Sequence, residues 1–133
     1  MSAARILDMK GHLVFSVGET APLTAVVDAL ATHGIGALVV TDASHDPVGI
    51  ISERDVIRTI ARDVNAMKRT ASDVMTRHVL TCSPGETAAD LAARMSKAGI
   101  RHLPVESSGQ IVGLVSARDV MGRHAEARSG AEG

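Results

Sequence analysis

A nine-residue segment that occurs twice constrains the fold of this chain more than any other feature. The segment VGIISERDV occupies residues 48–56, and VGLVSARDV occupies residues 112–120. The two copies lie 64 residues apart, and six of their nine positions are identical. Such a match within 133 residues indicates an internal duplication. We therefore expect the chain to fold as two copies of one supersecondary unit.

Each copy has the pattern of a short buried strand that runs into an amphipathic helix. Four apolar or glycine residues come first, and Ser-x-Arg-Asp then opens the helix, whose apolar face we expect Ile57, Ile60 and Ala61 to continue in the first copy. A serine followed three residues later by an acid is typical of a capping box. Capping does not require the arginine, however, and a hydroxyl, a guanidinium and a carboxylate at a helix start also suit a ribose and its phosphate. The residues concerned are Ser52, Arg54 and Asp55 in the first copy and Ser116, Arg118 and Asp119 in the second.

The composition favours a compact protein and excludes several classes of partner. At 133 residues and 45% hydrophobic, the chain can bury a core as one unit. A net charge of −1 creates no field that attracts nucleic acid or anionic membranes, and the lack of Trp and Tyr removes stacking platforms for single strands. No apolar run approaches the ~18 residues of a membrane span, and the single cysteine suits a reducing compartment. The sequence predicts a soluble cytoplasmic protein.

Other segments repeat in the same order. In the first half, strands at 14–17 and 37–41 flank a helix that ends at Gly34. In the second half, strands at 79–82 and 103–105 flank a helix that ends at Gly99. With the duplicated segment, each half reads β-α-β-β-α. Two such halves packed sheet to sheet about a pseudo-twofold axis would bury their apolar strands, giving an α/β (α+β) fold.

This order and these motifs resemble a tandem pair of cystathionine-β-synthase-type (CBS) domains, the Bateman module. The resemblance rests on two Gly-hh-Ser-x-x-Asp segments, at 49–55 and 113–119, and on IGALVV at 35–40 and IRHLPV at 100–105. The domain division that we predict is given by four ranges: repeat 1 at 6–62, a connector at 63–72, repeat 2 at 73–124 and a flexible tail at 125–133.

The resemblance implies a stand-alone regulatory protein that senses an adenosine-type ligand in the cleft between repeats. AMP, ADP, ATP, NAD(H) and S-adenosylmethionine are the compounds that such modules bind, and they need no catalytic cofactor. The Asp of each copy would hold the ribose hydroxyls, the Ser would lie near the ribose or phosphate, and the Arg would face the phosphates. Such modules commonly pair into homodimers and act on a further protein, here unknown. The implied binding residues are Ser16, Val17, Gly36, Ala37, Ser52, Arg54, Asp55, Thr81, Cys82, Arg101, His102, Pro104, Ser116, Arg118 and Asp119.

The two implied sites are expected to differ, because Gly36-Ala37 carries no charge whereas Arg101-His102 does. On this ground we expect the Asp119 side to bind the ligand more tightly. Arg101 and His102 have a second interpretation, as a solvated arginine and a partly buried histidine. Cys82 lies in an apolar strand pattern and is interpreted as a core thiol as well as a pocket residue.

Two further classes of function stay open. An assembly or interaction module with vestigial ligand sites would need only the fold, although two intact Ser-x-Arg-Asp segments argue against it. An enzyme would need a nucleophile–base pair or a metal set, and the six histidines show no i, i+4 pairing. The sequence also lacks both standard Gly-rich phosphate loops. We therefore predict neither an enzyme nor a metal site.

Overall fold

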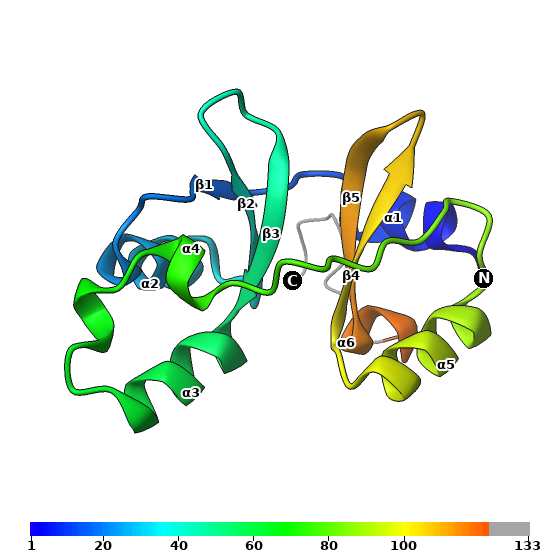
Figure 1. The fold of residues 1–133 in the computed structure, drawn as a ribbon. Helices are drawn as coiled ribbons and strands as arrows, with labels where there is room; N and C mark the ends of the chain where they lie inside the picture. Colours follow the sequence, from blue (N-terminus) through cyan, green and yellow to red (C-terminus); the bar gives the residue numbers. More distant parts are fainter. Residues whose placement is uncertain (123–133) are drawn as a thin grey trace. The chain divides into compact units, whose positions relative to one another are not determined.

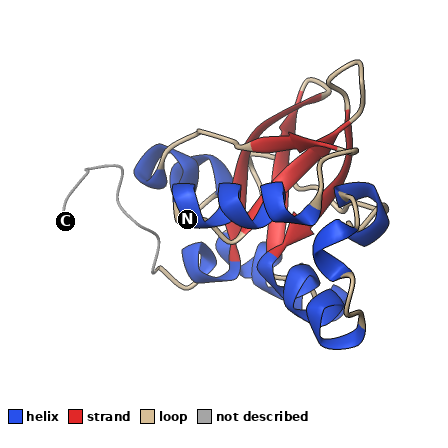
Figure 2. Cartoon of the chain, turned by 90° about the vertical axis from the view of Figure 1, so that its left-hand side faces the viewer, coloured by secondary structure: helices blue, strands red, loops and turns tan. Residues whose placement is uncertain are grey.

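The structure, a computed structural model, describes residues 1–122 and divides into two compact units (Figure 1). The continuous unit is Phe15–Val79, and the discontinuous unit is Met1–Val14 with the chain from Leu80 onward. Helices and strands both contribute, which gives the expected mixed α+β class (Figure 2). The predicted tail at 125–133 lies outside the described residues.

A three-stranded sheet organises the continuous unit. Its order is β1-β2-β3, with β1 parallel to β2 and β2 antiparallel to β3. Helix α2 connects β1 to β2 and ends, as predicted, at Gly34, whose φ of +61° suits a residue without a side chain. The elements of this unit are β1 (Ser16–Gly18), α2 (Leu23–His33), β2 (Ala37–Thr41), β3 (Pro47–Ser52), α3 (Glu53–Arg62), η1 (Ala66–Lys68) and α4 (Ala71–Val74).

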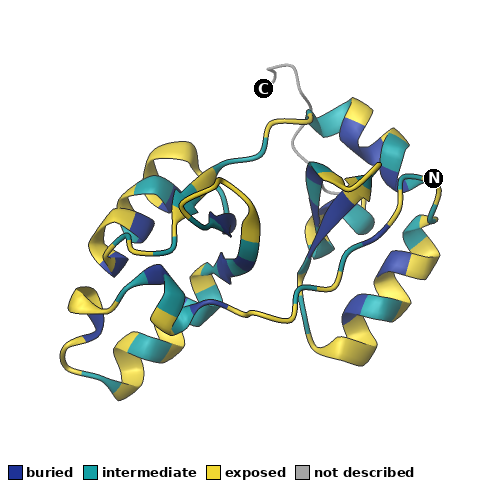
Figure 3. Cartoon of the chain, turned by 45° about the horizontal axis from the view of Figure 1, so that its top comes forward, coloured by how far each residue is buried: buried dark blue, intermediate teal, exposed yellow. Residues whose placement is uncertain are grey.

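An apolar core fills the space between this sheet and its helices. Helix α2 contributes buried residues at i, i+3 and i+7, β2 contributes two alternate positions, and β3 contributes one residue. In Figure 3, buried positions alternate with exposed ones along the helices. The most deeply buried members are Leu23, Val26, Leu38, Val40 and Ile51.

The discontinuous unit has a two-stranded antiparallel sheet and a core of its own. The predicted strand at 79–82 is not a full strand here: Cys82 alone forms a parallel bridge to Val105. Two backbone hydrogen bonds hold this bridge, from Cys82 N to Pro104 O at 2.9 Å and from Glu106 N to Cys82 O at 2.8 Å. The elements of this unit are α1 (Ala3–Lys10), α5 (Ala88–Ala98), β4 (His102–Ser107), β5 (Gln110–Ser116) and α6 (Ala117–Val120).

Helix α1 belongs to the second repeat in space, although it comes first in the sequence. It lies beside β5 (Figure 1), and its Ala3, Ile6 and Leu7 are buried in the core of the discontinuous unit. A Cβ on Gly113 of β5 would lie 2.5 Å from two methyl carbons of Leu7. The spatial units therefore differ from the sequence repeats at the N-terminus.

Gly49, the equivalent glycine of the continuous unit, also lies where a side chain would meet a neighbouring segment. A Cβ there would lie 2.5 Å from Sδ of Met75 and 2.8 Å from the carbonyl oxygen of Thr76. Each repeated glycine thus lets a neighbouring segment cross its strand closely.

Two local features differ from the sequence reading. The polar stretch at 63–72 contains η1 and the start of α4, which Thr70 caps through the backbone N–H of Asp73. On α3, only Val56 is buried, whereas Ile57 and Ile60 are 65% and 51% exposed. Within residues 1–122, no helix is long and apolar enough to cross a membrane.

Candidate functional site

The junction of β3 and α3 holds the first copy of Ser-x-Arg-Asp. The predicted capping box is confirmed: Ser52 Oγ accepts from Asp55 N at 3.2 Å, and Ser52 N donates to Asp55 Oδ2 at 2.9 Å. The Ser52 hydroxyl also donates to Asp55 Oδ2 at 3.1 Å. The hydrogen bonds that this carboxylate makes within residues 1–122 all use Oδ2. The described residues leave Oδ1 without a hydrogen bond.

Strand pairing brings the start of β2 to the same place. Ala37 lies opposite Ser52 in the sheet, and Glu53 N donates to Gly36 O at 2.9 Å. Gly36 and Ala37 thus lie beside Ser52 and the first turn of α3. Arg54, on that turn, is half-buried and makes no hydrogen bond or ion pair with any described residue.

Strand β1 contributes to this region with only one of its two candidate side chains. Ser16 is exposed and pairs with Val39 in the sheet. Val17 is half-buried and packs against the core of the continuous unit. The backbone of β1 lies next to β2, but the core takes up the Val17 side chain.

The discontinuous unit builds the second copy in the same way. Ser116 Oγ accepts from Asp119 N at 3.2 Å, and Ser116 N donates to Asp119 Oδ2 at 2.7 Å. His102 lies opposite Ser116, and Ala117 N donates to Arg101 O at 2.8 Å. The structure therefore brings Arg101 and His102 close to Ser116 and Asp119. Gly36 and Ala37 lie close to Ser52 and Asp55 in the same way.

Asp119 differs from Asp55 in having an internal cation beside it. Lys10 Nζ, at the end of α1, lies 2.6 Å from Asp119 Oδ2 and donates also to Leu114 O at 2.9 Å. Asp119 is only 4% exposed. In the continuous unit, the equivalent carbonyl of Ile50 accepts from the backbone N–H of Thr76 at 2.9 Å. Sequence reasoning missed Lys10, because its partner lies 109 residues away.

The remaining candidates differ in accessibility. Arg101 and Arg118 are exposed, and neither side chain forms an ion pair within the described part of the chain. Thr81 and His102 are half-buried, and Pro104 is fully buried. Basic side chains that lack a partner in the protein can take an anionic group of a ligand.

Cys82 lies in the apolar core of the discontinuous unit, 3% exposed. Burial, and secondarily the charge of Glu86, raises the pKa of its thiol to about 11. The thiol is therefore protonated at neutral pH and is a poor nucleophile. No group of three or more His, Cys, Asp or Glu side chains among residues 1–122 is arranged to hold a metal ion.

Comparison with known proteins gives two matches to one family along the chain. The family model "CBS domain" matches residues 9–62 and 71–126. A curated relative, an uncharacterised protein of Methanocaldococcus jannaschii, is 30% identical over 106 residues, which is 80% of this chain and 38% of that protein. The chain spans about a third to just over half of the first three curated relatives that it matches.

Solved structures agree with this assignment. A CBS-domain containing protein of Agrobacterium tumefaciens is 33% identical, with a TM-score of 0.88 and 92% of each chain covered. A CBS domain protein of Pyrobaculum aerophilum, solved with AMP, is 27% identical with a TM-score of 0.78, over 90% of this chain and 89% of that one. The CBS domain pair of protein MJ0100, solved with 5-methylthioadenosine and S-adenosyl-L-methionine, is 25% identical with a TM-score of 0.78, over 91% and 93%. The chain belongs to the CBS domain family, as a tandem pair of CBS repeats.

Proposed function

We propose that this CBS pair is a regulatory module that binds an adenosine-type ligand through Asp55, Ser52 and Arg54. The observation that carries the proposal is the junction of β3 and α3. There Oδ1 of the half-buried Asp55 carboxylate and the side chain of Arg54 lie on the same helical turn, and neither has a hydrogen-bond partner among residues 1–122. Two structurally similar CBS proteins were solved with AMP or with S-adenosyl-L-methionine and 5-methylthioadenosine. All three compounds contain adenosine.

The chemistry of this junction fits a nucleoside better than an arbitrary anion. A carboxylate oxygen accepts hydrogen bonds from the two vicinal hydroxyls of a ribose, and hydrogen bonds to a charged acceptor contribute about 1.5–3 kcal/mol. Gly36 presents no side chain where β2 begins, so its backbone can approach a ligand closely. Arg54 complements a phosphate or a carboxylate. AMP, ATP, NAD(H) and S-adenosylmethionine all offer the ribose, and they differ in the group that Arg54 would meet.

A second candidate function, self-association, is favoured by one observation. Ile57 and Ile60 on α3 are more than half exposed, and Val64 just beyond the helix is 101% exposed. Large apolar side chains grouped on one helix indicate an interaction surface. We propose that two chains pair through this surface as a homodimer in the cytoplasm and that the ligand state of the dimer is read by a further protein.

A ligand panel tests the proposed function. Thermal unfolding is recorded with AMP, ATP, NADH and S-adenosylmethionine at millimolar concentration. A ligand at 100 times its Kd, bound only to the native state, stabilises by roughly 2.7 kcal/mol, which corresponds to several degrees for a chain of this length. If none of the four compounds moves the melting temperature, the adenosine proposal is refuted.

The matched variants are Asp55→Asn and Asp73→Asn. Both aspartates occupy the N3 position of a capping box in the continuous unit, where the amide oxygen of Asn can still accept from the backbone N–H of the N-cap residue. Only Asp55 is proposed to hold a ribose. Calorimetric titration should show a tenfold to roughly hundredfold weaker affinity for Asp55→Asn and an unchanged affinity for Asp73→Asn. Equal affinities in the two variants would mean that Asp55 is a cap and nothing more.

A further inference from the structure

Lys10 places a positive charge beside the carboxylate of Asp119, which is the residue of the second repeat equivalent to Asp55. Its Nζ lies 2.6 Å from Asp119 Oδ2, and its second acceptor is Leu114 O at 2.9 Å. The Lys10 side chain is 26% exposed, whereas that of Asp119 is 5% exposed. Asp119 is thus almost removed from water, whereas Asp55, which has no such cation beside it among residues 1–122, is half-buried.

We propose that Lys10 is a tethered competitor that closes the Asp119 site, so that the chain binds one adenosine-type ligand, at Asp55. The inference rests on the proposed function and states which of the two repeats binds the ligand. It reverses the order expected from the sequence, where Arg101, His102 and Arg118 favoured the Asp119 side.

The competition follows from the charge of Lys10 and from the burial of Asp119. Lys10 Nζ makes a short, charge-assisted contact with Oδ2, and the whole Asp119 side chain is only 5% exposed, so neither of its carboxylate oxygens is open to solvent as those of the half-buried Asp55 are. A ribose hydroxyl is neutral and cannot replace the Coulomb attraction of an ammonium group for a carboxylate that is almost removed from water. A ligand at Asp119 has to displace Lys10 first, and its apparent affinity falls accordingly.

Among the described residues, no cation equivalent to Lys10 contacts Asp55. In the continuous unit the carbonyl of Ile50 is satisfied by the backbone N–H of Thr76, a residue whose side chain has no charge. No salt bridge reaches Asp55 from any lysine or arginine of residues 1–122. The duplicated fold thus holds one open and one closed aspartate, and a single residue of α1 makes the difference.

The test counts ligands per chain for the whole protein. AMP and S-adenosylmethionine are titrated by calorimetry and counted by mass spectrometry under native conditions. The wild type should bind one equivalent, and Asp55→Asn should weaken this binding about tenfold to a hundredfold. Lys10→Met keeps the aliphatic stem and removes the charge, so it should add a second equivalent. The double variant Lys10→Met/Asp55→Asn should retain one.

Two control variants separate the charge of Lys10 from general effects. Lys10→Arg keeps a cation at the end of α1 and should stay at one equivalent. Lys97→Met removes an exposed lysine of α5 in the same unit and should behave as the wild type.

Several outcomes would overturn the proposal. If the wild type binds two ligands per chain with equal affinity, Lys10 does not close the Asp119 site. The same conclusion follows if Asp55→Asn still binds one ligand with full affinity, and this result does not depend on whether Lys10→Met folds. Weaker AMP binding in Lys10→Met would make Lys10 a ligand contact instead of a competitor. If neither compound binds any of these proteins, the proposed function falls as well, whereas binding in the wrong pattern refutes only the role of Lys10.

Discussion

Asp55 and Asp119 occupy equivalent positions of the two repeats but have different partners. Their substitution by Asn should therefore change the stability of the ligand-free protein by different amounts. Asp119→Asn breaks the ion pair with Lys10 and should lower the free energy of unfolding by about 1–3 kcal/mol. Asp55→Asn breaks no ion pair, and its amide oxygen can still accept from Ser52 N, so it should cost only the charge at the start of the helix, about 0.3–1 kcal/mol. Thermal or urea unfolding of the two variants measures the difference. Equal losses would contradict the structural role of Lys10.

The sequence predicted both aspartates but could not predict this contrast. Capping boxes are local, and Ser-x-x-Asp three residues apart is enough to recognise them. The Lys10–Asp119 pair joins residues that are 109 positions apart, and nothing near Lys10 in the sequence indicates its partner. Such contacts depend on how α1 packs, which is a property of the folded unit.

The repeated glycines should tolerate a methyl group poorly. Gly49→Ala would place Cβ 2.8 Å from the backbone oxygen of Thr76, so β3 and the segment after α4 must move apart. The two hydrogen bonds between Ile50 and Thr76 would lengthen with this movement. We expect a loss of about 1–3 kcal/mol in unfolding free energy, measured by urea denaturation. Gly85→Ala is the control, because no atom lies within 4 Å of its Cβ, and a similar loss there would contradict the steric explanation.

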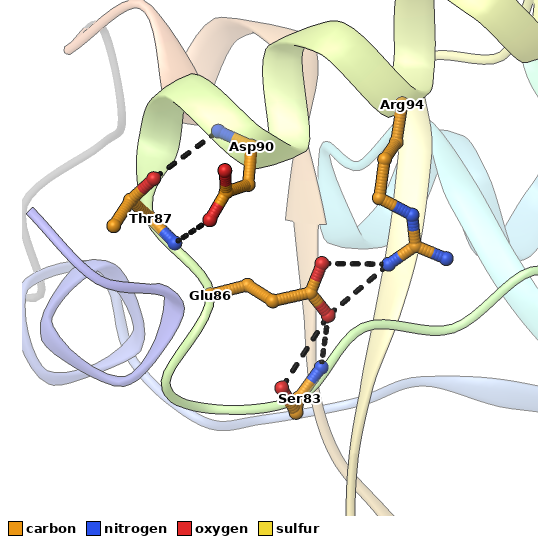
Figure 4. A network of polar contacts seen from close by, with 5 residues as sticks. All are labelled: Ser83, Glu86, Thr87, Asp90 and Arg94. Atoms are coloured by element: carbon orange, nitrogen blue, oxygen red, sulfur yellow. Dashed lines mark hydrogen bonds and ion pairs between the residues drawn. The ribbon is translucent and has the colours of Figure 1, made fainter.

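The turn that leads into α5 is held by a network of side chains (Figure 4). Glu86 accepts from Ser83 N at 2.8 Å and from Arg94 at 2.9 and 3.1 Å, and Thr87 and Asp90 cap the helix beside it. The hydrogen bond from Ser83 N, followed by the contacts with Arg94, lowers the pKa of Glu86 below its ordinary value of 4.5. The network therefore stabilises the charged form of Glu86.

A carboxyl group with a lowered pKa in the folded state stabilises the fold above its unfolded pKa and loses this effect as the pH falls through the folded pKa. Glu86→Gln should thus lower the melting temperature at pH 7, and the difference from the wild type should shrink below pH 4.5. Glu19→Gln, at the corresponding turn of the continuous unit, is the control, because the Glu19 side chain makes no hydrogen bond within residues 1–122. A difference that is independent of pH would refute the role of the charge.

Helices were predicted more accurately than the short strands and the connector. The ends of α2 and α5 at Gly34 and Gly99 are confirmed, because both glycines have the positive φ that a helix stop uses. The strand at 79–82 is reduced to one bridge, since its pairing depends on where β4 runs and not on its own apolar pattern. The connector has no hydrophobic period, and η1 within it follows from the packing of Ala66 into the core.

For the protein as a whole, we expect a homodimer that depends on the exposed face of α3. Ile57→Ser/Ile60→Ser removes apolar area that already faces solvent, so the variant should keep its fold and become a monomer. Light scattering at micromolar concentration measures this change. Leu13→Ser, which alters another exposed apolar side chain, is the control and should stay dimeric. A monomeric wild type, or a dimeric double variant, would rule out this surface.

The division of the chain into a continuous and a discontinuous unit also sets an order of folding during synthesis. Residues 15–79 are complete once they leave the ribosome, and they can fold as a block. Helix α1, made earlier, has to wait for the strands and helices after Leu80 before it can bury Ile6 and Leu7. At about 5–20 residues per second this delay is roughly 3–13 s for the intervening segment alone. During that interval Ile6 and Leu7 have no core to pack against, and chaperones and proteases can reach them.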